Sequence, residues 1–207
     1  MKAKEKISRA DQAERRREAL LCISLRLFSE KGFHGTSIRD IAREAGITEG
    51  LIYHYFQSKK DLLKAIVAAS VDDSEVYQNS ELLESAPIDQ ALWKIGVDVL
   101  ERLRKKKEIF RLMLAEAGLF ERDGDHFFPK LVYENRMIRL GDFLKRRMAR
   151  GEIRKTEPVL LARQFTGSLV AFFIFQEILQ GKKVAPVESG DFLKGLVEVF
   201  MNGIKRA

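Results

Sequence analysis

The chain has 207 residues, of which 45% are hydrophobic and 32% charged, enough for one or two small domains with an apolar core. Its net charge is +7, and residues 1–60 hold 13 lysines and arginines against 8 aspartates and glutamates, so most of the positive excess lies in the first third. That asymmetry favours a polyanionic partner, either nucleic acid or a membrane surface.

The first third of the chain predicts three helices. Residues 1–10 are polar, and we expect them to be flexible. Over residues 11–31 apolar side chains recur at helical spacing. The one cysteine, Cys22, falls in this pattern, so we expect a buried thiol, and no internal disulfide is possible. A second helix begins near residue 36 and breaks at "AGIT", and a third covers about residues 49–56.

The remainder of the chain predicts six more helices and no strand. Glycine, proline and charge runs separate them. Their expected ranges are 59–83, 87–106, 108–122, 130–149, 156–180 and 191–205. The sequence therefore predicts an all-α, nine-helix fold. A three-helix N-terminal domain covers residues 1–58, and a C-terminal helical domain covers residues 59–207.

The second and third helices have the residues of a helix-turn-helix. Ala42 allows a close helix crossing, Gly46 suits a left-handed turn, and Ile47 fills the core after it. One side of the third helix carries the expected core residues Leu51, Ile52, Tyr55 and Phe56. The other side carries Glu49, Gly50, Tyr53 and His54. In such a motif the second helix enters the DNA major groove.

The stretch "FSEKGFHGTSIRDIAREAGITEGLIYHYFQSKKDLL" resembles the DNA-binding domain of the tetracycline-repressor (TetR) family of bacterial transcriptional regulators. The resemblance implies roles at matching positions. Phosphate contacts are implied for Thr36, Ser37, Thr48, Tyr53, Tyr55 and Lys59. Base reading is implied for Glu49, Gly50 and Leu51, with Arg39 reaching a groove edge and His54 on the same DNA-facing side. Glu49 either accepts from a cytosine amino group or only caps the helix start.

The C-terminal part has more aromatic residues than a small bundle needs. Most of them are expected in the core, but the excess also permits an apolar cavity, and the resemblance implies a small-molecule effector there. The expected ligand-binding residues are Trp93, Phe110, Met113, Leu114, Glu116, Phe120, His126, Phe127, Phe128, Phe165 and Phe172.

The last two predicted helices are too apolar for one copy of the chain to bury easily. Residues 169–175 are apolar nearly all round, and the final helix carries a long apolar stripe. The resemblance implies a homodimer that pairs these helices as a four-helix bundle. The expected interface residues are Phe165, Leu169, Phe172, Phe173, Phe192, Leu196 and Phe200.

The sequence has no signature of an enzyme or of a metal site. The three histidines and one cysteine have no ligand spacing, and no phosphate loop or nucleophile motif is present. We therefore expect no cofactor and no metal. The longest uncharged run in the apolar C-terminal part, residues 164–176, is too short to span a bilayer, so we expect a cytoplasmic protein without a membrane partner.

The functional expectation is a DNA-binding transcriptional regulator. We expect a repressor that an apolar or amphipathic small molecule releases from a palindromic operator in double-stranded DNA. One alternative is a DNA-organising protein with the same fold, a filled core and no effector. Another is a scaffold protein whose N-terminal domain no longer binds DNA, a possibility that the acidic Glu49 favours.

Overall fold

The computed structural model describes residues 8–71, 80–121, 126–127, 130 and 137–204. These residues contain helices and no strand, which confirms the all-α class. The helices are α1 (Arg9–Lys31), α2 (Ile38–Ala45), α3 (Glu49–Tyr55), α4 (Lys59–Val71), α6 (Ser80–Ser85), α7 (Ile88–Lys105), α8 (Lys107–Ala115), α9 (Ala117–Glu121), α11 (Ile138–Ala149), α12 (Pro158–Phe173) and α13 (Ser189–Ile204). Between α12 and α13 lie a π-helical turn, Ile174–Ile178, and a 3-10 turn, Gly181–Lys183.

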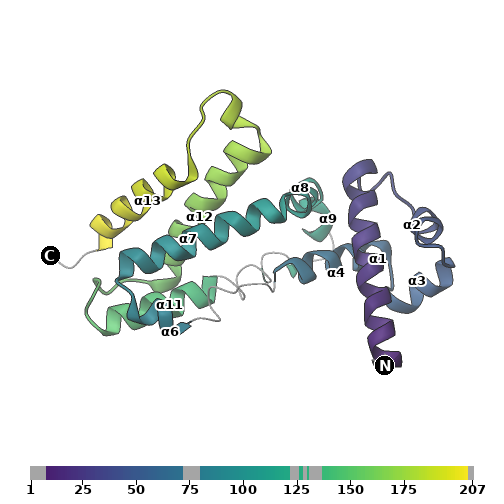
Figure 1. Cartoon of the computed structure of the whole chain (residues 1–207), viewed down its shortest axis with the longest axis horizontal. Helices are drawn as coiled ribbons and strands as arrows, with labels where there is room; N and C mark the ends of the chain where they lie inside the picture. Colours follow the sequence, from purple (N-terminus) through teal and green to yellow (C-terminus); the bar gives the residue numbers. More distant parts are fainter. Residues whose placement is uncertain (1–7, 72–79, 122–125, 128–129, 131–136, 205–207) are drawn as a thin grey trace, which may run out of the picture.

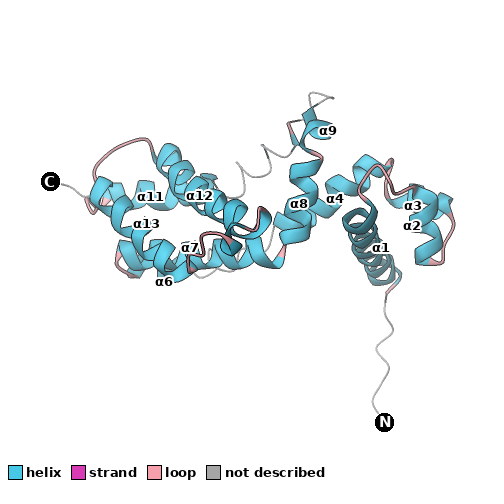
Figure 2. Ribbon diagram, turned by 90° about the horizontal axis from the view of Figure 1, so that it is seen from above, coloured by secondary structure: helices cyan, strands magenta, loops and turns pink. Residues whose placement is uncertain are grey.

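The molecule is elongated, with the three N-terminal helices at one end. Figure 1 shows α1, α2 and α3 gathered at one end and α11, α12 and α13 at the other. The view from above in Figure 2 keeps the same separation, with α4 and α8 between the two groups. The predicted N-terminal and C-terminal groups of helices are therefore distinct in space.

The N-terminal helices enclose their own apolar core. Its buried members include Leu27, Phe28, Ile41, Ile52 and Phe56. The inner face of α4 joins this core, and so do two residues of α8. These added residues are Leu62, Leu63, Ile66, Val67, Leu112 and Met113. The division proposed after residue 58 thus precedes a helix whose buried side packs with the N-terminal helices.

Cys22 is exposed, so the prediction of a buried thiol was wrong. The buried positions of α1 in this region are Leu20, Leu21, Ser24, Leu27 and Phe28. At 100° per residue, position 22 lies about 200° from both positions 20 and 24, on the solvent side of the helix. The apolar residues were read as one stripe, but the cysteine lies outside it.

The C-terminal core lies among α7, α11, α12 and α13. Helix α12 packs on α7 and α11, and α13 covers α7. The largest fully buried side chains here belong to Leu92, Ile95, Phe143, Phe165 and Phe173. Gly96 allows α13 to approach α7, because an added Cβ would lie 2.5 Å from a methyl group of Leu193.

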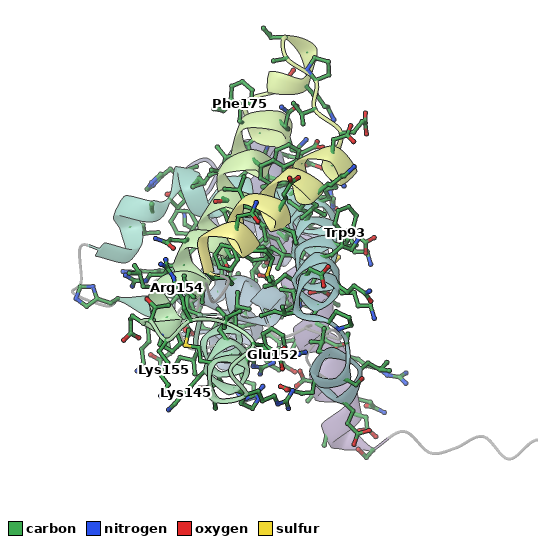
Figure 3. All side chains as sticks on the ribbon, turned by 90° about the vertical axis from the view of Figure 1, so that its left-hand side faces the viewer. Trp93, Lys145, Glu152, Arg154, Lys155 and Phe175 are labelled. Carbon is green, nitrogen blue, oxygen red and sulfur yellow. The ribbon has the colours of Figure 1, made fainter. Side chains whose placement is uncertain are left out.

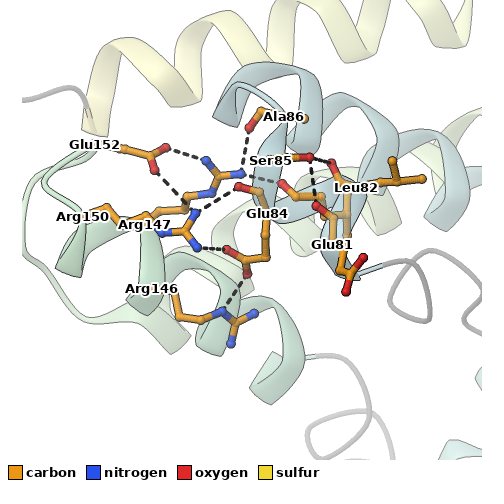
Figure 4. A network of polar contacts seen from close by, with 10 residues as sticks. Glu81, Leu82, Glu84, Ser85, Ala86, Arg146, Arg147, Arg150 and Glu152 are labelled. Atoms are coloured by element: carbon orange, nitrogen blue, oxygen red, sulfur yellow. Dashed lines mark hydrogen bonds and ion pairs between the residues drawn. The ribbon is translucent and has the colours of Figure 1, made fainter.

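A network of arginines and glutamates joins α6 to α11 (Figure 4). The guanidinium of Arg147 is 3% exposed, and it donates to the Ala86 carbonyl at 2.8 Å and to Glu152 at 2.6 Å. Arg146 and Arg150 pair with Glu84 at 2.7 and 2.8 Å. Partial burial acts to raise the pKa of the Glu84 carboxyl, but the hydrogen bond from Arg146 and the three arginine charges outweigh it and lower that pKa.

Several helices end earlier than the sequence predicts. The described part contains eleven α-helices where nine were expected. The predicted helix 108–122 is split at Glu116 into α8 and α9. The break predicted between residues 106 and 108 is present, at Lys106, where φ is −109°. The charge run at residues 104–108 marks the break at Lys106, whereas no proline marks the break at Glu116. Residues 8–10 were expected to be flexible, but Ser8 caps α1, which begins at Arg9. The expected flexibility of residues 1–7 and the helical continuity through 72–79 and 131–136 lie outside the described residues.

Candidate functional site

The turn between α2 and α3 has the geometry of a helix-turn-helix. Ser37 caps α2, and its hydroxyl and backbone N–H both donate to the Asp40 carboxylate. Gly46 takes the left-handed conformation, with φ of 66°, and the Ile47 N–H donates to the Ala42 carbonyl at 3.0 Å. The Thr48 hydroxyl then caps α3 by accepting from the Leu51 N–H at 3.4 Å. Each junction therefore has a local side-chain or glycine cause.

Helix α3 divides into a buried and an exposed face, as the sequence predicted. Ile52 is 0% exposed and Phe56 3% exposed, and Leu51 and Tyr55 are half-buried. The other side is open to solvent, and Tyr53 is 52% exposed. The exposed group consists of Thr48, Glu49, Gly50, Tyr53 and His54. A short helix thus presents a polar and aromatic surface that no other described element covers.

Helix α2 adds polar groups beside this surface. Arg39 and Ser37 are exposed, and Arg43 pairs with Asp40 at 2.7 Å. The side-chain and backbone hydrogen bonds from Ser37, followed by the charge of Arg43, lower the pKa of Asp40. This carboxylate therefore stays ionised near neutral pH, and it holds the start of α2 in place.

Two of the residues assigned to phosphate contact face inward. Thr36 is 1% exposed, and its hydroxyl lies 2.9 Å from the Gly32 carbonyl oxygen and 3.2 Å from that of Leu27. The Lys59 ammonium donates to the carbonyls of Phe33 and Thr36 at 2.8 and 2.9 Å. It also lies 4.3 Å from the centre of the Phe33 ring. Both side chains bind the loop between α1 and α2, which gives them a structural role.

A cavity of about 350 Å³ lies in the larger group of helices. Its walls come from the end of α4, from α7 and α8, and from α12. The lining residues are Ser70, Arg102, Leu103, Lys106, Ile109, Phe110, Met113, Leu114, Ala117, Met137, Arg163, Thr166, Gly167, Val170 and Ile174. Its size and mainly apolar walls suit a small organic ligand.

Three residues assigned to the ligand site line this cavity, namely Phe110, Met113 and Leu114. Glu116 instead lies 3.3 Å from His34 in the loop before α2. Phe165 is 0% exposed in the core and packs on Phe200. Phe172 stacks on Phe192 with ring centres 4.0 Å apart.

The other assigned ligand residues are also placed elsewhere. Trp93 is 37% exposed in an open surface groove between α7 and α13. Figure 3 shows it at the right-hand edge of the molecule, well away from Phe175 at the top. His126 is exposed, and Phe127 packs against the N-terminal core. The side chains of Phe120 and Phe128 lie outside the described residues.

None of the predicted ligand residues is among the polar members of the cavity, which are Ser70, Arg102, Lys106, Arg163 and Thr166. One signal could have found two of them. Arg102 and Lys106 are four residues apart, so they share a helix face with Ile109 and Met113.

The predicted interface residues fall into two groups. Phe165, Leu169 and Phe173 are at most 1% exposed in the single chain, so a second copy is not needed to bury them. Phe172, Phe192, Leu196 and Phe200 are half-buried. The solvent side of α12 carries Leu160, Gly167, Ala171 and, in the following turn, Phe175, and that of α13 carries Gly195, Val199 and Gly203.

Residues 158–178 are apolar and long enough to cross a membrane by length and composition alone. Core helices of soluble proteins meet the same criterion, and the inner face of α12 packs on α7 and α11. The described residues contain no group of three or more His, Cys, Asp or Glu that could hold a metal ion.

An exposed second helix in a helix-turn-helix, joined to a helical domain with an apolar pocket, is typical of DNA-binding transcriptional regulators. Residues 21–66 match the bacterial regulatory proteins of the tetR family. Residues 90–203, more than half of the chain, match the C-terminal domain of AefR-like transcriptional repressors. The chain belongs to the TetR family, whose members are regulators and not enzymes.

Relatives match this chain either along most of its length or over a short segment. YvkB of Bacillus subtilis, an uncharacterised HTH-type transcriptional regulator, is 24% identical over 89% of this chain and 95% of its own length. The transcriptional repressor KstR2 of Rhodococcus jostii is 45% identical, but over only 28% of each chain. Sequence identity is therefore low over the full chain, and the higher identity is confined to a short segment.

Solved structures share the fold. A TetR-family regulator from Mesorhizobium loti superposes with a TM-score of 0.77 at 19% identity, over 94% of this chain and 99% of that one. AibR, solved with isovaleryl coenzyme A and operator DNA, superposes with a TM-score of 0.62 at 21% identity, over 89% and 97%. At these identities the likeness establishes the fold alone.

Proposed function

We propose that the protein is a repressor that binds a palindromic operator as a homodimer and leaves it when a small molecule fills the C-terminal cavity. The exposed face of α3 is the observation that carries this proposal. Tyr53 is 52% exposed, and it lies on a helix whose opposite face is buried in the N-terminal core. The proposed DNA contacts are Ser37, Arg39, Thr48, Glu49, Gly50, Leu51, Tyr53, His54 and Tyr55, with Lys59 as a supporting residue.

Dimerisation supplies the second recognition helix. The solvent side of α13 carries Val199 at 72% exposure, beside Gly195 and Gly203, which allow a second helix to approach closely. Val199→Glu should shift sedimentation velocity towards monomer, because it places a charge at the centre of the proposed interface. Val184→Glu is the matched control, since that valine is 87% exposed in the loop before α13. Equal behaviour of both variants would remove this interface from the proposal.

Helix α4 offers the path from cavity to DNA. Its first residue, Lys59, donates hydrogen bonds to carbonyls of the loop between α1 and α2, and Ser70 near its end lines the cavity. A ligand that fits the cavity better in the non-binding arrangement shifts the population by its difference in affinity. AibR, which shares the fold, was solved with both a small molecule and operator DNA, and this supports the pairing of functions.

The DNA-organising alternative expected a filled core, and the cavity of about 350 Å³ counts against it. Release by ligand, rather than ligand-promoted binding, is part of the proposal. So is a cytoplasmic location, which follows from a DNA target and the family's function.

The purified full-length protein should be selected against randomised duplexes at one stated salt concentration near physiological. We expect an enriched palindrome with half-sites about one helical turn, ~34–36 Å, apart. Binding without any enriched sequence would favour the organiser alternative. Absence of binding by protein freed of ligand would favour the scaffold alternative.

A further inference from the structure

The cavity is apolar but its charged members all have one sign. Arg102, Lys106 and Arg163 line it, and its described lining contains no aspartate or glutamate. Arg102 is 7% exposed and forms an ion pair with Asp98 in the same helix. Lys106 is half-buried and Arg163 is exposed. A cation at the edge of an apolar pocket favours an anion more than the same cation would in open water.

Lys106 has the most informative position of the three. It lies at the junction of α7 and α8, where the helix breaks. Its ammonium donates to the backbone carbonyl of Ser70 at 2.5 Å, and Ser70 also lines the cavity. Arg102 lies one helical turn before it on α7, and Arg163 comes from the facing helix α12. The cations thus come from two walls of one space.

We propose that the effector is an apolar chain with an anionic head group, and that the head group binds Lys106 in exchange for the Ser70 carbonyl. This inference rests on the proposed function and names the ligand class of the same cavity. The apolar walls formed by Phe110, Met113, Val170 and Ile174 receive the chain. At about 30 Å³ for each water-sized group, the cavity holds roughly a dozen such groups, which fits a medium-length chain.

The exchange also allows the ligand to change how α4 is held against the cavity wall. The Lys106–Ser70 hydrogen bond joins the wall of the cavity to the last turn of α4. A carboxylate that binds the ammonium competes with the Ser70 carbonyl for it and weakens this bond, while the apolar chain fills the space beside it. A neutral chain fills the same space but leaves the bond intact.

The test uses isothermal titration of the full-length protein with three probes of one chain length, in the absence of DNA. The probes are decanoate, decan-1-ol and decyltrimethylammonium. We expect decanoate to bind most tightly and decan-1-ol at least about tenfold more weakly, because the alcohol lacks the charge-assisted hydrogen bond. Decyltrimethylammonium should bind most weakly, because its charge repels the ammonium of Lys106.

Two variants locate the head group. Lys106→Met should weaken decanoate binding by about ten- to a hundredfold and leave decan-1-ol binding unchanged, which shows that the cavity is intact. Lys105→Met, at an exposed neighbouring lysine outside the cavity, should change neither. Equal affinities for decanoate and decan-1-ol, or equal effects of the two variants, would overturn the inference.

Operator binding distinguishes this inference from the proposed function. If decanoate binds as described but does not release the selected operator, the ligand class stands and the repressor mechanism fails. If neutral or cationic molecules release the operator and decanoate binds no better than decan-1-ol, the repressor mechanism stands and the ligand class fails.

Discussion

Replacement of Lys59 by Met should destabilise the protein through its N-terminal core. The ammonium makes two hydrogen bonds to carbonyl oxygens and lies over the Phe33 ring, and the side chain is half-buried. Hydrogen bonds from a charged donor contribute about 1.5–3 kcal/mol each, and a partly exposed cation–π contact about 0.5–1 kcal/mol. Because the site is not fully buried and methionine keeps the apolar stem, we expect a loss of about 3 kcal/mol.

Urea unfolding followed by circular dichroism, at one protein concentration, measures this loss. Lys94→Met is the control, because Lys94 is exposed on α7. A loss below about 0.5 kcal/mol for Lys59→Met would refute the reasoning, since it is the size expected of an ordinary surface change. The salt dependence of DNA binding by the same folded variant measures its other role. An unchanged slope assigns the ammonium to the fold alone, and a fall of about one assigns it a phosphate contact as well.

Three other changes test separate parts of the account. Gly35→Ala should lower the melting temperature, with a loss of about 2 kcal/mol or more, because its Cβ would lie 2.3 Å from the Lys31 carbonyl oxygen; Gly118→Ala, with nothing within 4 Å, should not. Glu84→Gln should destabilise the protein by about 1 kcal/mol at neutral pH. Since the folded pKa of Glu84 is lowered, its contribution is present above the ordinary value of 4.5 and is lost as pH falls through the folded pKa, so the difference in urea midpoint should close in acid. Tyr53→Phe should weaken operator binding about fivefold without changing stability, because the hydroxyl is exposed; unchanged affinity in a fluorescence titration would exclude it as a phosphate donor.

The helix-turn-helix could be predicted because its signals are local. Ser37 and Asp40 form a capping box, Gly46 takes the left-handed turn, and the faces of α3 follow from helical spacing. Each feature depends on residues no more than four apart. Such features survive in any tertiary context that keeps the helices together.

The inward role of Lys59 could not be predicted in this way. It depends on where the loop after α1 lies relative to α4, and the bonds from Lys59 to that loop join residues 26 and 23 positions apart. Most of the cavity lining could not be predicted for a related reason. An apolar spacing of 3.6 residues is the same whether a helix faces a filled core or an open space, so Phe165 and Phe110 could not be told apart. The charge run at residues 104–108 predicted the break at Lys106, but nothing local shows that this lysine contacts Ser70, 36 residues away.

The central claim is that the exposed face of α3 reads one operator as part of a dimer. Fluorescence anisotropy should compare the selected palindrome with a scrambled duplex of the same composition, at one stated salt concentration and without ligand. We predict two chains bound per palindrome, with an affinity at least about a thousandfold above that for the scrambled duplex. Equal affinity for the two duplexes, or one chain per palindrome, would contradict it.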